Sequence, residues 1–108
     1  MSDQFYGTYR LKENKTYERC SVLEWSKQHS ELYRTNKLHV GHIDIDAYTV
    51  STVWLGVDHS FSFSNKPILF ETMVLGADYQ DRYSTWEEAE EGHKKAVQWV
   101  LDGCKEIE

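Results

Sequence analysis

The chain has 108 residues, a formal net charge of −6 and two cysteines that lie far apart in the sequence. This length is that of one domain, the negative charge argues against sequence-independent binding to nucleic-acid phosphates, and the cysteine spacing argues against a disulfide framework or a zinc knuckle. Because the sequence contains neither a signal peptide nor an apolar run of membrane-spanning length, we expect a single cytosolic domain, residues 1–108, that binds no membrane.

The N-terminal third predicts a strand followed by a helix. Residues 5–11 alternate loosely between aromatic and polar types, which is typical of an edge strand. Ser21 and Glu24 have the spacing of a capping box, so a helix is predicted over residues 22–34. One side of this helix is an apolar stripe made of Val22, Trp25, His29, Leu32 and Tyr33. We interpret the histidine in the stripe as a buried or rim residue with satisfied hydrogen bonds.

Residues 38–46 predict a half-buried strand. Two isoleucines alternate along it with three polar residues, His42, Asp44 and Asp46. The two aspartates are spaced as in some metal-binding loops, but the further oxygen ligands and the central glycine of a calcium-binding loop are missing. We therefore interpret the polar side of this strand as a solvated surface.

Residues 48–59 and 67–76 are rich in β-branched and aromatic types and predict two antiparallel strands that pair. With Asp58 opposite Ile68, the two-residue period assigns every side chain to one of two faces. The first face collects Ser51, Val53, Leu55, Val57, His59, Leu69, Glu71, Met73 and Leu75. The second face collects Val50, Thr52, Trp54, Gly56, Asp58, Ile68, Phe70, Thr72 and Val74. Neither face is cleanly polar, so we expect one under helices and the other under more chain, a second subunit or a ligand.

Glu71 is the polar residue of this hairpin that needs a partner. It falls among aliphatic residues, and a buried carboxylate requires a partner or a raised pKa, so we expect it to be buried against His93 or Arg82. The loop 60–66 between the strands places Phe61 and Phe63 among hydroxyl residues. Such aromatic residues suit contact with a partner, and they equally suit packing onto the sheet.

The C-terminal third predicts an acidic turn at residues 77–81 and a second helix over residues 85–102. The start of this helix has two alternative capping boxes, Thr85 with Glu88 or Ser84 with Glu87. Its buried stripe comprises Trp86, Ala89, His93, Ala96, Val97, Val100 and Cys104. Trp99 lies at the flank of the stripe, where it either closes the edge of the core or anchors a subunit contact.

Together these elements predict an α+β domain in the form of a small two-layer sandwich. An antiparallel sheet of three to five strands is expected to carry both helices, at about 22–34 and 85–102, on one face. Because both faces of the hairpin are mixed and Trp99 stands at a helix flank, a two-fold homodimer is the expected assembly.

Three motifs carry a resemblance to a known family. Residues 50–59 (VSTVWLGVDH), 69–74 (LFETMV) and 82–93 (RYSTWEEAEEGH), preceded by Leu-Glu-Trp at 23–25, resemble a family of small uncharacterised proteins of tailed bacteriophages and prophages. The resemblance implies a phage origin, a place in the cytoplasm of an infected bacterium and a non-structural accessory role. The loop 60–66 departs from the family, in which we expect more glycine and proline at this point.

Two sets of residues have the chemistry of a site. Asp58, His59, Glu71 and His93 are the types found in a metal site or an acid–base pair, although their spacing matches no metal motif. Trp54, Arg82 and Tyr83 are the types that hold the base and phosphate of a nucleotide. No nucleophilic triad, phosphate-binding glycine loop or dinucleotide fingerprint is present, and no cofactor is expected.

The leading hypothesis is a non-catalytic binding protein. It engages a host protein, such as a defence component, through acidic surface and the aromatic Phe61 and Phe63, or it sequesters a small nucleotide-like ligand. The alternative is a small metal-dependent hydrolase that uses Asp58, His59, Glu71 and His93.

Overall fold

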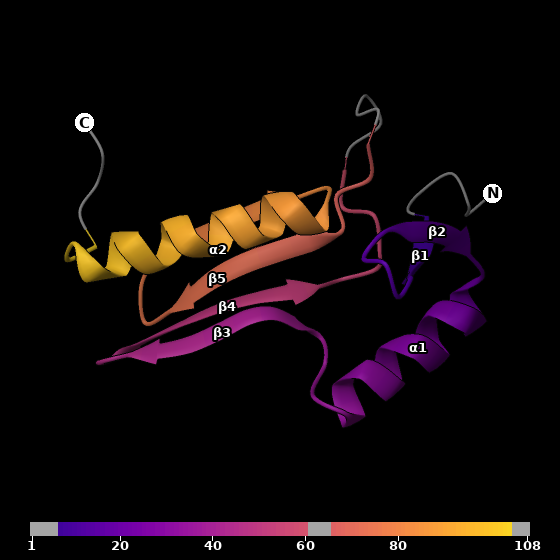
Figure 1. Cartoon of the computed structure of the whole chain (residues 1–108), viewed down its shortest axis with the longest axis horizontal. Helices are drawn as coiled ribbons and strands as arrows, with labels where there is room; N and C mark the ends of the chain where they lie inside the picture. Colours follow the sequence, from indigo (N-terminus) through magenta and orange to yellow (C-terminus); the bar gives the residue numbers. More distant parts are fainter. Residues whose placement is uncertain (1–6, 61–65, 105–108) are drawn as a thin grey trace.

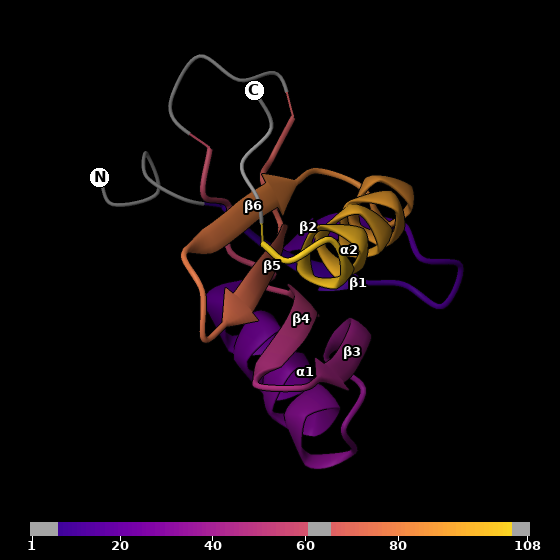
Figure 2. The same cartoon turned by 90° about the vertical axis from the view of Figure 1, so that its left-hand side faces the viewer.

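The computed structural model describes residues 7–60 and 66–104, which form two antiparallel sheets and two helices. The elements in chain order are β1 (Thr8–Leu11), β2 (Tyr17–Cys20), α1 (Val22–Arg34), β3 (His39–Ile45), β4 (Tyr48–Trp54), β5 (Phe70–Leu75), β6 (Tyr79–Tyr83) and α2 (Trp86–Leu101). β1 pairs with β2, and the other strands form one sheet in the order β3-β4-β5-β6 with α2 along one face (Figures 1 and 2). The expected α+β class with an antiparallel sheet is confirmed. Neither helix of the described ranges has the length and apolar character needed to cross a membrane.

The predicted pairing of the central strands β4 and β5 is confirmed, with a shifted register. Trp54 lies opposite Phe70, two residues away from the expected alignment. Gly56 has a φ of +76°, a left-handed conformation that favours glycine, and the chain leaves the ladder there. Beyond it the N–H of His59 donates to the carbonyl of Ile68 at 2.9 Å, close to the expected alignment. Because a shift of two residues leaves every side chain on its own face, the predicted faces hold within β4 and β5.

The core lies between α2 and one face of the four-stranded sheet. Alternate residues of the two central strands are buried there: Val50, Thr52, Trp54, Phe70, Thr72 and Val74. The helix contributes mostly small buried residues, Ala89, Gly92, Ala96 and Val100. Small residues let the helix backbone approach the sheet closely, so larger side chains from the strands fill the space between them.

Both helices begin at capping boxes that the sequence predicts. The Ser21 side chain accepts from the N–H of Glu24, whose side chain accepts from the N–H of Ser21. Thr85 and Glu88 make the same reciprocal pair at the start of α2. These contacts satisfy backbone donors that have no partner within the helix, and they fix where each helix starts.

The position of α1 differs from the prediction that both helices share a face of the sheet. α1 packs against β1, beyond the end of the four-stranded sheet (Figure 1). Trp25 Nε1 donates to the carbonyl of Leu55 at 3.1 Å, and the Gln28 side chain bonds both the N–H and the carbonyl of Leu11. The helix buries no residue fully, and Tyr33 of its predicted stripe is 77% exposed. Two polar anchors and the partly buried Leu32, which packs against the core, therefore hold α1 at the sheet end.

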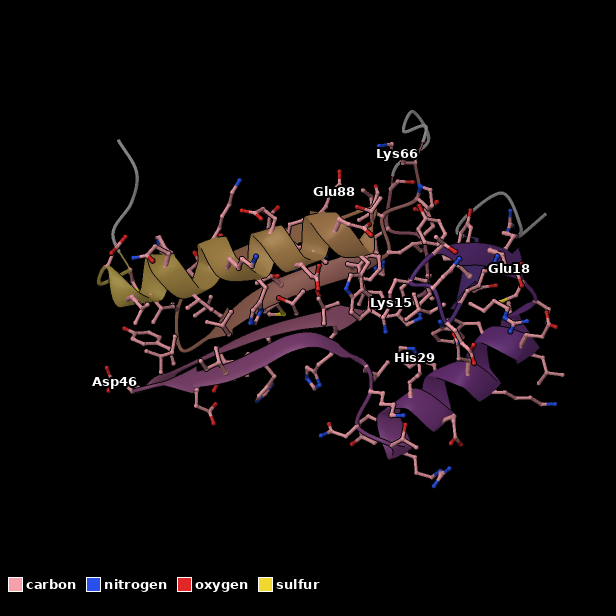
Figure 3. All side chains as sticks on the ribbon, viewed as in Figure 1. Lys15, Glu18, His29, Asp46, Lys66 and Glu88 are labelled. Carbon is pink, nitrogen blue, oxygen red and sulfur yellow. The ribbon has the colours of Figure 1, made fainter. Side chains whose placement is uncertain are left out.

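The structure contains two strands that the sequence analysis did not predict. β2 follows the turn after β1, and β6 occupies much of the segment interpreted as an acidic turn. In β6 the two tyrosines face α2, whereas Gln80 and Arg82 face away from it. This alternation is typical of a strand, but the charged residues between the tyrosines favoured the interpretation as a turn. The β1–β2 hairpin closes one end of the core, and Lys15 at its tip lies 4.4 Å from the centre of the Trp86 ring, at the end opposite Asp46 (Figure 3).

Candidate functional site

The four-stranded sheet has a second face on which no described helix packs. α2 contacts all four strands from one side, and α1 packs against β1. We call the uncovered side the open face. The strand register places on it His39, His42, Asp44, Thr49, Ser51, Val53, Glu71, Met73, Leu75, Gln80 and Arg82.

The open face exposes apolar side chains on an inner strand. Met73 is 41% exposed and Leu75 is 52% exposed, although β5 has a paired strand on each side. Polar groups surround them, including Asp44, which accepts a hydrogen bond from Thr49 at 2.7 Å. Met73 and Leu75 are thus exposed apolar residues with polar neighbours on the same face.

Glu71 is held at one end of the open face. Its side chain is 14% exposed and pairs with Arg82, with 3.0 Å between Oε2 and Nε. Gln80 donates to the same oxygen. The expected pairing of Glu71 with Arg82 is therefore confirmed, whereas the expected contact with His93 is wrong, because His93 extends from α2 onto the opposite face of the sheet.

A polar row crosses the middle of the helix-covered face. Thr52 and Thr72 are fully buried neighbours on β4 and β5, with their hydroxyl oxygens 2.5 Å apart. The Thr52 oxygen also lies 2.7 Å from Nδ1 of His93, whose ring occupies the space above Gly41. Burial lowers the pKa of His93, and the charges of two neighbouring histidines lower it further. An imidazole with a lowered pKa therefore lies in the interface between helix and sheet.

The hydroxyl and imidazole of this row resemble a nucleophile and its base, but the hydroxyl is inaccessible. Thr52 and Thr72 have no exposed surface, and the partly buried His93 ring bonds the Thr52 oxygen from the side of the helix. A nucleophile must reach a substrate atom, so we assign this pair to holding α2 on the sheet.

A pocket of about 450 Å³ opens between β6 and α2. It is lined by Ile68, Asp81, Arg82, Tyr83, Ser84, Glu88, Glu91, Gly92 and Lys95. The Glu88 carboxylate is engaged in the helix cap, and the Arg82 guanidinium turns to Glu71 on the open face. Tyr83 directs its hydroxyl into the core, where burial raises its pKa to about 12. The pocket walls are thus richer in carboxylates than in available cations.

The residues expected to form a nucleotide pocket are not gathered in it. Arg82 and Tyr83 line the β6–α2 pocket, but Trp54 is 1% exposed and packs edge-on against Phe70 in the core. Phe61 and Phe63 lie outside the described residues.

The residues of the alternative metal site are also apart. Asp58 closes the base of the loop by accepting from the N–H groups of Ser60 and Ile68, and Nδ1 of His59 bonds the carbonyl of Val57. Glu71 and His93 lie on opposite faces of the sheet. Within residues 7–60 and 66–104, no three His, Cys, Asp or Glu side chains are grouped to hold a metal ion.

The sequence did not indicate that Met73 and Leu75 are exposed on an inner strand. Both were assigned to the same hairpin face as Glu71, so their shared face was available from the two-residue period. Which hairpin face lacks a helix was not available, because each face is mixed.

Comparisons with known proteins add no relative to this description. No protein-family model matches the chain, and no curated protein or solved structure is significantly similar to it.

Proposed function

We propose that this chain is an accessory protein of bacteriophage origin that acts in the cytoplasm of an infected bacterium by binding a host protein, without catalysis. The observation that carries the proposal is the open face, where Met73 and Leu75 are exposed on an inner strand. A methionine adapts its shape to a partner surface, and a surrounding polar rim supplies specificity. The phage origin rests on the three motifs described above.

A non-catalytic role is supported by the hydrogen bonds that already engage the potentially reactive side chains. The fully buried Thr52 hydroxyl is bonded to the His93 imidazole, and the side chains of Asp58 and His59 make local backbone contacts. Sequestration of a nucleotide-like ligand is supported less well. The β6–α2 pocket contains Asp81, Glu88 and Glu91, which repel phosphate.

The test is photo-cross-linking from the open face. A benzophenone amino acid in place of Met73 is expected to capture one discrete host protein in lysate of a susceptible bacterium. The matched control places the same group at Gln98, which is exposed on the outer side of α2. The proposal predicts an adduct from position 73 that is absent from position 98. No adduct at either position, or the same adducts at both, contradicts it.

We also propose that the chain forms a two-fold homodimer through the open face when no host protein occupies it, because pairing then covers the exposed apolar residues of this face. Trp99 does not supply this contact, since it packs on Tyr79 with ring centres 4.8 Å apart and closes the core edge. Light scattering at micromolar concentration is expected to give twice the chain mass of 12.7 kDa. Met73→Asp is expected to return the mass to that of one chain, and a wild-type protein of single-chain mass would refute the dimer.

A further inference from the structure

Two histidines share the open face at the edge strand β3. His39 lies opposite Val53 and His42 opposite Ser51, although the histidines are three residues apart. In a regular strand, residues three apart face opposite sides. The register shift between His39 and Gly41 is a bulge, and it returns His42 to the face of His39. Without the bulge, the two imidazoles would lie on opposite faces of the strand; with it, they lie on the same face.

The two rings are close enough to share one ion. Their centres are 4.8 Å apart and their planes are inclined by 75°. Two imidazoles bound to one tetrahedral ion through bonds of about 2.0–2.1 Å have ring centres about 5 Å apart. The short side chains of Ser51 and Val53 lie next to the rings on β4, and His42 is exposed whereas His39 is partly exposed.

We propose that His39 and His42 bind one late first-row transition-metal ion through two imidazole nitrogens. Imidazole suits Ni²⁺, Cu²⁺ and Zn²⁺, whereas the oxygen-preferring Mg²⁺ and Ca²⁺ are poorly matched to it. No third ligand of the described residues is grouped with the pair, so the remaining coordination positions are open to water or to an external donor. This is a two-ligand site at the edge of the open face, distinct from the four-residue set of the metal-dependent hydrolase hypothesis.

The test is a calorimetric titration of tag-free protein with Ni²⁺, which avoids oxidation of the two free cysteines by Cu²⁺. One Ni²⁺ per chain is expected at pH 7.5, and His39→Gln and His42→Gln are each expected to weaken binding at least tenfold. The control is His59→Gln, because His59 lies in the loop region and makes a local backbone bond. It is expected to leave the affinity unchanged.

A second readout localises the ion independently of the mutations. Paramagnetic Ni²⁺ below one equivalent is expected to broaden the backbone amide signals of Ser51 and Val53 before that of Leu101. Unchanged affinity in both His39→Gln and His42→Gln, or an equal loss in His59→Gln, would overturn the site and indicate adventitious binding. Met73→Asp is expected to preserve Ni²⁺ binding, so failure of the proposed protein interface and failure of the metal site are distinguishable.

Discussion

Thr52→Val is expected to lower the free energy of unfolding by about 2–4 kcal/mol, the largest loss we predict for a change that preserves side-chain shape. The Thr52 hydroxyl bonds both Thr72 and His93, and it has no exposure to water. Valine removes both bonds and leaves the fully buried Thr72 hydroxyl and the partly buried His93 Nδ1 without this partner. A buried polar group left unsatisfied costs about 1–3 kcal/mol, and the lost bond to His93 adds to that cost. Urea denaturation followed by tryptophan fluorescence measures the change.

The matched control for Thr52→Val is Thr49→Val on the same strand. Thr49 lies on the open face, where its bond to Asp44 is accessible to water, so a change within about 0.5 kcal/mol is expected. In the Thr52→Val/Thr72→Val double variant the loss is expected to be smaller than the sum of the single losses, since one bond is counted in both. Equal effects of Thr52→Val and Thr49→Val would show that the polar row does not hold α2.

Gly92→Ala is expected to destabilise the protein by about 1–3 kcal/mol, although alanine normally stabilises a helix interior by about 1 kcal/mol relative to glycine. A Cβ at position 92 would lie 2.1 Å from the Tyr83 hydroxyl oxygen and 2.2 Å from the ring carbon that bears it. Gly92 is buried and the tyrosine hydroxyl is enclosed, so the ring must move within a packed core. Thermal or urea unfolding gives the magnitude.

The Tyr83→Ala background separates this clash from any other effect of Gly92→Ala. With the ring removed, the intrinsic preference of the helix for alanine remains, so Gly92→Ala is expected to become stabilising. A loss of the same size in both backgrounds would contradict the assignment of Gly92 to accommodating Tyr83.

Within the candidate site, the sequence predicted that Glu71 and Met73 share a face of the sheet. It did not predict which partner Glu71 binds or that Met73 is exposed. The period of two placed them together, and the charge of Glu71 required a partner. The choice between Arg82 and His93 depended on which hairpin face α2 covers. The helix fits on that face because Gly41 and Gly92 have no side chains and leave room for the rings of His93 and Tyr83. No local sequence pattern predicts such contacts.

The sequence by itself determined the starts of both helices and the pairing of β4 with β5. These features depend on groups a few residues apart, as in the Ser21–Glu24 and Thr85–Glu88 boxes, or on alternation along one strand. Only the tertiary structure decided the place of α1 beyond the sheet, the exposure of Met73 and the pairing of His39 with His42. The physical reason is that each of these depends on how backbone and side chains fit together in three dimensions: polar anchors on the hairpin, the face that the helix leaves uncovered, and a bulge in an edge strand.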